Sequence, residues 1–511
     1  MASAVRVIPN HYRDSIALMQ LSATLAKLPG VMQAFAVMGS PSNLALLRDA
    51  KLYTGTLEAG LYDLVIVIGG TSDAQVAHAM EVARQTLEER PAAGTEGRVS
   101  GEMPARSLAM ALAREPRANL VLVSTPGEYA AAEAEKALRL GLHVMLFSDN
   151  IPLADEIALK RLARERGLLV MGPDCGTSII NGVPLAFANV VRRGDIGCVA
   201  ASGTGLQQVT CLIDRLGAGI SQAIGTGSRD LSAEVGGISM LEGIAALVND
   251  ANTKVIVLIS KPPSPKVSEV VLEAASRTGK PIVVNFLGAD PRDIQAPNLH
   301  PATTLEDAAH AAVALQNGQQ YSPHDRGQQP RLAVPKLGKG RRYVRGLYSG
   351  GTFCYEASLL LTQALSKVQS NAPVDPRDQL DDVWVARGHT VIDLGDDVFT
   401  RGRPHPMIDH RLRNERLVRE AADPEVGVIL FDVVLGYGSH PDPAEEMAAA
   451  LDEARTRAPD LVLVGFVCGT EQDPQGLARQ EARLLAAGVV LADCNAAAVR
   501  LTASILTGDA R

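Results

Sequence analysis

Two short turns hold the residues best suited to bind an anion, Ser202-Gly203-Thr204-Gly205 and Ser349-Gly350-Gly351-Thr352. Each follows an apolar run typical of a strand and precedes a helical stretch. Small residues let the backbone approach a ligand, and the first N–H groups of a helix have no partner within it. A helix amino terminus therefore attracts negative charge. We predict that both turns bind phosphate; the alternative is an ordinary glycine-containing turn.

A cation-rich segment runs from Thr400 to Asp409. Arg401 and Arg403 are suited to bidentate binding of a carboxylate or a phosphate. Two prolines fix φ and stiffen the chain on either side of His405, which could donate to a developing oxyanion or move a proton. We predict that Arg403 and His405 are catalytic and that Arg401 and Asp409 bind substrate. The alternative is a solvated basic loop.

A glycine-rich loop from Gly225 to Asp230 is a further anion-binding candidate. Its single Arg–Asp pair predicts a catalytic role for Arg229 and a substrate-binding role for Asp230, or else a purely structural loop. Cys175, in the turn Gly172–Thr177, has no fixed base nearby and is expected to be structural.

Parallel sheets flanked by helices must position these residues, because short β-branched runs alternate with long helical stretches. The sequence predicts a multi-domain α/β chain. A small α+β domain covers residues 1–92, and the stretch Pro91–Gly101 reads as a linker. A Rossmann-like βαβαβ domain covers residues 102–193, with helices that end at Gly141 and Gly167.

Two further parallel α/β domains of flavodoxin-like type follow, at residues 194–316 and 343–511, and a polar linker at 317–342 joins them. The runs Cys198–Ala201 and Val344–Tyr348 lead into the two Ser-Gly turns. The later strands Val255–Ser260 and Gly427–Asp432 also correspond. A duplicated α/β unit is the simplest explanation, and a pseudo-twofold would bring both helix termini to one anion.

The composition narrows the class of partner. The 511 residues carry a net charge of −8 with no block of like charge, which argues against nucleic acid and anionic membranes. Aromatic residues are only 4%, so stacking platforms for single strands are not expected. No apolar run is long enough to cross a membrane, the cysteines lack metal-site spacing, and no secretory leader is evident. We expect a cytoplasmic protein with reduced thiols.

From Leu120 to about Ala289 the chain resembles the α subunit of succinyl-CoA synthetase and related NDP-forming acyl-CoA synthetases. The resemblance rests on Met171–Cys175, on Ser202-Gly203-Thr204 and on Ile224–Gly227. It implies that residues 102–193 form a CoA-binding-type domain without its CoA loop, followed by two ligase-like domains. The family's Gly-Glu-x-Gly-Gly is replaced by Ile259–Pro263, and its phosphohistidine loop is absent. His300 lies near the position of that loop.

The whole chain is more similar to the FdrA family. The matching segments are Met171–Thr177, continuing through Asn181–Asn189, and Gly402–Asp409, together with Asn10–Ser15. This resemblance implies a subunit of an oxamate carbamoyltransferase, which moves a carbamoyl group between carbamoyl phosphate and oxamate or oxalurate in allantoin breakdown. It also implies partner subunits. We further predict that Asn189 binds substrate.

Three functions remain open at this stage: a carbamoyltransferase subunit, an NDP-forming acyl-CoA ligase or relative, and a non-catalytic scaffold subunit. For the first we expect the two Ser-Gly turns to hold phosphate, Arg229 and Arg403 to hold charged oxygens, and His405 to polarise the carbamoyl oxygen. We expect no metal or resident cofactor, and an oligomeric assembly.

Overall fold

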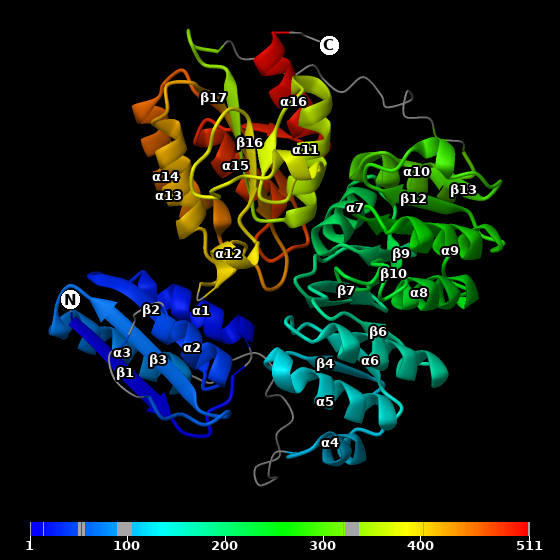
Figure 1. The fold of residues 1–511 in the computed structure, drawn as a ribbon, viewed down its shortest axis with the longest axis horizontal. Coiled ribbons are helices and arrows are strands. Elements are labelled where there is room, and N and C mark those ends of the chain that lie inside the picture. Colours follow the sequence, from blue (N-terminus) through cyan, green and yellow to red (C-terminus); the bar gives the residue numbers. More distant parts are fainter. Residues whose placement is uncertain are drawn as a thin grey trace.

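The computed structural model describes residues 2–13, 15–49, 53, 57–88, 105–319, 321, 337–401 and 403–508. In this part of the chain the strands form four sheets, which follow one another along the sequence (Figure 1). The expected α/β class with several parallel sheets is confirmed. No helix among the described residues is long and apolar enough to cross a membrane.

The first sheet is antiparallel, with strand order β1-β3-β2. The helices α1 and α3 bury aliphatic side chains against one face, and α2 contributes Leu47 to the core on the other. The elements are β1 (Ala2–Ile8), α1 (Ser15–Ala26), β2 (Val31–Met38), α2 (Pro41–Asp49), β3 (Leu64–Gly70) and α3 (Asp73–Glu88).

The second sheet is the expected βαβαβ arrangement, with parallel strands in the order β4-β5-β6. Gly141 and Gly167 have positive φ values of 81° and 66° directly after the helix ends, which confirms their role as left-handed caps. The elements are α4 (Leu108–Arg114), β4 (Leu120–Val123), α5 (Gly127–Arg139), β5 (His143–Leu146), α6 (Leu153–Glu165) and β6 (Val170–Met171).

The third sheet has seven strands in the order β13-β12-β11-β9-β10-β7-β8. Its antiparallel hairpin β7–β8 begins at Thr177, so this sheet includes residues well before the boundary expected at 194. The elements are β7 (Thr177–Ile180), β8 (Val183–Ala186), β9 (Arg193–Ala201), α7 (Gly203–Arg215), β10 (Ile220–Gly225), α8 (Ile238–Asn249), β11 (Val255–Ser260), α9 (Pro265–Ser276), β12 (Ile282–Phe286), β13 (Leu299–Pro301) and α10 (Leu305–Gln316).

The fourth sheet repeats this plan with six parallel strands in the order β15-β16-β14-β17-β18-β19. In this sheet β16, β17, β18 and β19 occupy the places relative to β14 that β10, β11, β12 and β13 occupy relative to β9. A duplication requires this correspondence. The elements are β14 (Tyr343–Tyr348), α11 (Gly351–Leu365), β15 (Gln369–Ser370), β16 (Thr390–Asp393), α12 (Asp397–Thr400), α13 (Arg411–Ala421), β17 (Val426–Val434), α14 (Pro443–Arg457), β18 (Val462–Cys468), α15 (Leu477–Ala486), β19 (Val490–Ala492) and α16 (Asn495–Thr507).

The two repeated units share one hydrophobic core. Apolar side chains of α7 and α10 pack together with those of α11 and α16 in a single buried cluster that reaches both sheets. A buried carboxylate joins the same helices, because Glu356 accepts hydrogen bonds from the Leu305 N–H and the Asn495 amide. This interface fixes the carboxyl edges of the two sheets relative to each other.

The predicted linker Pro91–Gly101 lies outside the described residues. The same holds for 322–336 within the linker expected at 317–342.

Candidate functional site

The amino termini of α7 and α11 meet, as the two Ser-Gly turns predicted. The hydroxyl oxygens of Ser202 and Thr352 are 2.7 Å apart, although the residues are 150 positions apart in the chain. Ser202 also caps α7, because its oxygen accepts a hydrogen bond from the Gly205 N–H. A β-carbon on Gly350 would lie 2.8 Å from the Thr204 methyl carbon, so this close approach requires glycine.

Several backbone donors at this junction are free for a ligand. The N–H groups of Gly203, Thr204, Gly351, Thr352 and Phe353 donate no hydrogen bond to any described residue. By contrast, the Ser349 and Gly350 N–H groups donate to the carboxylate of Asp432, at 2.8 and 3.0 Å. We expected these two residues to donate their N–H groups to phosphate. That expectation is wrong, because both N–H groups already donate to the Asp432 carboxylate.

A lysine and a carboxylate flank the start of α11. A β-carbon on Gly351 would lie 2.5 Å from Asp393 Oδ2 and 3.5 Å from Lys261 Nζ. Lys261 follows the end of β11 and makes no hydrogen bond or ion pair with the described residues. Asp393 ends β16, and burial raises its pKa to about 6 although the charge of Lys261 opposes that shift. The junction thus combines an unpaired cation with a carboxyl that titrates near neutral pH.

His405 faces the same place as a neutral hydrogen-bond donor. Burial lowers its pKa to about 4, so the imidazole is uncharged at neutral pH. Its Nδ1 accepts a hydrogen bond from the Met407 N–H at 3.2 Å, which leaves the proton on Nε2. A β-carbon placed on Gly395 would lie 2.9 Å from His405 Nε2 and 3.1 Å from Asp393 Oδ1, so both side-chain atoms lie close to the same point. The oxyanion role expected for His405 stays a prediction.

An aromatic contact connects this histidine to the second sheet. The ring of Phe187 lies 5.9 Å from that of His405 and 5.9 Å from that of Phe147, which directly follows β5. The residue that follows β5 is therefore connected to His405 through the ring of Phe187.

The charges at this junction predict a pH-dependent affinity for sulfate, which keeps its double negative charge throughout the range tested. Deprotonation of Asp393 as the pH rises through about 6 adds a negative charge beside the anion. We expect sulfate affinity to fall by about tenfold between roughly pH 5 and 7.5, which is the effect of about 1.4 kcal/mol.

The Asp393→Asn variant is expected to bind sulfate with nearly constant affinity over this range. Asp397→Asn, which removes an exposed carboxylate from the same segment, serves as the control and should keep the wild-type slope. Calorimetric titration measures both. An unchanged slope in Asp393→Asn would remove this carboxyl from the anion site.

The loop holding Arg229 and Asp230 has a structural role, which corrects the ligand-binding role expected for both. Asp230 is completely buried and binds Lys160 Nζ at 2.7 Å, and its carboxylate also accepts the Ser239 and Met240 N–H groups at the start of α8. Arg229 forms an ion pair with the buried carboxylate of Glu156 at 2.9 Å. These contacts join the second and third sheets.

Asn189 also joins units instead of facing the anion site. Its amide nitrogen donates to the Leu435 carbonyl and to Asp473, and its oxygen accepts from Gln207, all at buried positions. With every one of these groups engaged, the substrate-binding role expected for Asn189 is not supported by its surroundings.

The remaining predicted residues divide between a local ion pair and the surface. Asp409 binds the guanidinium of Arg411 two residues later. Arg401 and Arg403 are exposed, and the Arg403 guanidinium lies 6.0 Å from the centre of the Trp384 ring. Gly402 lies outside the described residues. Among the predicted catalytic residues, His405 alone lies beside the paired helix termini.

Lys261 and Asp393 were missed by the sequence prediction. The sequence carried a weak signal for each of them. Each stands at the end of a buried strand, and the corresponding strand of the other repeated unit also ends near the site. The lysine also occupies the place where the resembling synthetases carry a Gly-Glu loop.

Three protein-family models match parts of the chain. The model described as "CoA-ligase" matches residues 347–505, and the model described as "CoA binding domain" matches residues 191–288. The model described as "AllF, heavy metal-associated domain" matches residues 1–103. The N-terminal domain lacks the residues for a thiolate metal site, since Cys175 is the first cysteine of the chain. Nowhere in the described residues do three His, Cys, Asp or Glu side chains gather in a way that could hold a metal ion.

Partial similarity extends to CoA ligases. The chain is 27% identical over 174 residues to succinate–CoA ligase [ADP-forming] subunit alpha 2 of Archaeoglobus fulgidus, which covers 33% of this chain and 59% of that protein. The expected similarity to the succinyl-CoA synthetase α subunit is thereby confirmed. Among solved structures, the dinucleotide forming acetyl-coenzyme A synthetase 1 of Ca. Korarchaeum cryptofilum matches with a TM-score of 0.32 at 15% identity, over 77% of this chain and 83% of that one.

Similarity over nearly the full length is found with one protein of Escherichia coli, named as uncharacterized protein YahF. The two sequences are 43% identical over 501 residues, which is 96% of each chain. The chain therefore belongs to the same protein family as YahF.

Proposed function

We propose that this chain binds an acyl phosphate between the amino termini of α7 and α11 and takes part in transferring its acyl group. The observation that carries this proposal is the contact between Ser202 and Thr352, which brings two sets of free N–H donors together beside Lys261. Backbone donors at helix termini, hydroxyls and an unpaired ammonium are the groups that proteins use for phosphate.

The other side chains suit the acyl carbon. His405 is a neutral Nε2–H donor that would stabilise the oxyanion formed when an acceptor attacks the acyl carbon. The bond between that carbon and the phosphate oxygen then breaks, and inorganic phosphate leaves while held by α7, α11 and Lys261. The proton lost by the acceptor passes to Asp393, whose pKa of about 6 suits a group that takes and returns a proton near neutral pH.

Carbamoyl phosphate is the acyl phosphate that we favour, with oxamate as acceptor. The proposal rests on the resemblance of Met171–Thr177, Asn181–Asn189 and Gly402–Asp409 to the FdrA family. Carbamoyl transfer itself requires neither CoA nor a phosphorylated histidine. His300, which lies near the sequence position of the family's phosphorylated histidine, pairs with Val283 near the beginning of β12, whereas the proposed anion site follows the carboxyl ends of β9 and β11.

A second candidate is acyl transfer to CoA, as in NDP-forming acyl-CoA synthetases. It is favoured by the matches to "CoA-ligase" and "CoA binding domain" and by the similarity to succinate–CoA ligase α subunits. Both candidates use an acyl phosphate, and they differ in the acceptor. For either one, the similarity to a ligase subunit supports an assembly with partner subunits.

Titration calorimetry of the full chain separates the candidates. Saturable binding of carbamoyl phosphate without binding of CoA or ATP would support the carbamoyl proposal, and binding of CoA would favour the ligase. Absence of any binding, including inorganic phosphate and sulfate, would contradict the anion site itself. Gly351→Val is the control that fills the site, because its side chain would collide with Asp393.

The Thr204 hydroxyl offers a smaller test of the same site. Thr204→Val keeps the shape of the side chain and removes one donor, for which we expect about a 3- to 10-fold loss of carbamoyl phosphate affinity, or about 1 kcal/mol. Thr210→Val is the matched control, because that hydroxyl bonds only within α7. Unchanged affinity in Thr204→Val would mean that phosphate is held by backbone donors and Lys261 alone.

A further inference from the structure

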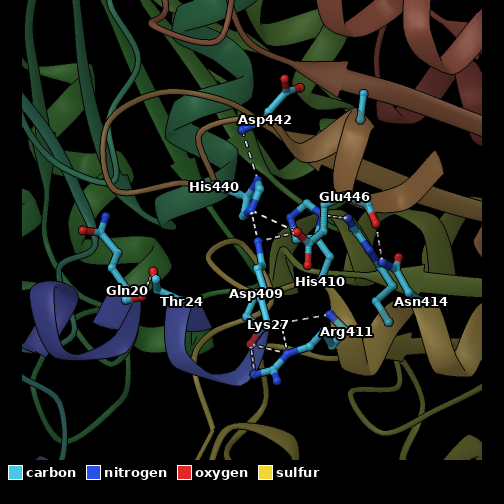
Figure 2. A network of polar contacts seen from close by, with 12 residues as sticks. Gln20, Thr24, Lys27, Asp409, His410, Arg411, Asn414, His440, Asp442 and Glu446 are labelled. Atoms are coloured by element: carbon cyan, nitrogen blue, oxygen red, sulfur yellow. Dashed lines mark hydrogen bonds and ion pairs between the residues drawn. The ribbon is translucent and has the colours of Figure 1, made fainter. Parts of the chain in front are cut away.

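Lys27, which directly follows α1 in the N-terminal domain, contacts the unit built on the fourth sheet (Figure 2). Lys27 Nζ lies 2.5 Å from Glu446 Oε2 on α14 and 3.0 Å from His440 Nε2. The Glu446 side chain is only 12% exposed. An ion pair with one partner this well shielded from solvent holds two domains together better than a pair on the open surface.

The same carboxylate is tied to the segment that carries His405. His440 Nε2 lies 3.2 Å from Glu446 Oε2, and its Nδ1 accepts the Asp442 N–H, which places the ring proton on the side of Glu446. The backbone N–H of His440 donates a hydrogen bond to the Met407 carbonyl at 2.8 Å. Glu446 therefore forms an ion pair with Lys27 of the N-terminal domain. Through His440, it is also connected to the segment that carries His405.

A buried arginine extends these contacts to the start of α11. The ring of His410 lies 5.5 Å from that of His440, and its Nδ1 lies 3.1 Å from Arg413 Nη2. Arg413 is completely buried, and its Nη1 donates to Ser349 Oγ at 2.8 Å and to Asp432 Oδ1 at 3.0 Å. Asp432 in turn binds the backbone just before α11, as described above.

We propose that docking of the N-terminal domain through Lys27 on Glu446 holds residues 405–413 and the amino end of α11 in the arrangement that binds the anion. Lys27 is thus a positioning residue for the site, and the N-terminal domain has a role in regulating it. The inference rests on the proposed function only in identifying that arrangement as the anion site.

Hydrogen exchange of the full chain, followed by mass spectrometry, tests the docking without reference to activity. In Lys27→Glu we expect faster exchange in residues 405–413 and 349–354 as well as in α1. Lys27→Arg should restore protection, since it keeps the ion pair. Arg48→Glu, at an exposed position of the same domain, is the control and should exchange like the wild type. Faster exchange confined to the N-terminal domain, or no change in Lys27→Glu, would overturn the proposal.

Sulfate titration of the same variants separates this inference from the proposed function. We expect Lys27→Glu to bind sulfate about 3- to 10-fold more weakly than the wild type, and Lys27→Arg to bind it normally. If the wild type binds no sulfate, the proposed function fails while the exchange result still decides the docking. Equal sulfate affinity in wild type and Lys27→Glu would overturn the link between docking and site.

Discussion

Lys261→Met is expected to bind sulfate or an acyl phosphate about 100-fold more weakly than the wild type. The Lys261 ammonium lies beside the free donors of α7 and α11 and forms no ion pair with a described residue, and a charged hydrogen bond contributes about 1.5–3 kcal/mol. A loss near the upper end of that range corresponds to about two powers of ten in the dissociation constant. Methionine keeps the length and the apolar stem of lysine, so the variant should fold normally.

Titration calorimetry measures this loss against two controls. Lys266→Met removes an exposed lysine at the start of α9, five positions further along the chain, and is expected to bind like the wild type. Lys261→Arg keeps the charge and should retain most of the affinity. Wild-type affinity in Lys261→Met would show that the helix termini bind the anion unaided, or that the anion lies elsewhere.

Asp230→Ala is expected to lower the free energy of unfolding by about 3–5 kcal/mol, because it leaves the buried Lys160 with one carboxylate fewer and strips two N–H groups of α8 of their acceptor. Both side chains of the Lys160–Asp230 pair are completely buried. Asp230→Asn should be less damaging, since its oxygen can still accept one of these N–H groups.

Chemical denaturation followed by circular dichroism gives this value. Asp155→Ala, which removes an exposed carboxylate from the first turn of α6, should change stability by no more than about 0.5 kcal/mol. A loss below about 1 kcal/mol in Asp230→Ala, accompanied by weaker anion binding, would return Asp230 to the substrate-binding role that its loop suggested.

The parts of the site that depend on local sequence were predictable, and the repetition strengthened them. Small residues after an apolar strand indicate a helix amino terminus, so both turns could be located, although the residue before α11 is Gly350 and not Ser349, which had been paired with Ser202. Their meeting followed from the duplication, since equivalent helices packed about a pseudo-twofold bring equivalent ends together. The left-handed caps at Gly141 and Gly167 were predictable for the same local reason.

The roles of charged residues were not predictable, because their partners lie far away in the chain. Arg229 and Asp230 have the composition of an anion-binding loop. They form ion pairs instead with Glu156 and Lys160, which lie some 70 positions earlier in the chain. Asp432 likewise takes the N–H groups that Ser349 and Gly350 were expected to offer. Lys261 shows the converse: it has no distinguishing motif, and it is available to a ligand because it forms no ion pair with a described residue, although Asp393 lies nearby.

The single core shared by α7, α10, α11 and α16 has a consequence for how the molecule folds and moves. Neither repeated unit can bury this apolar interface by itself, so the two are expected to gain and lose structure as one cooperative body. The two halves of the proposed anion site are therefore expected to keep their relative positions when a ligand binds.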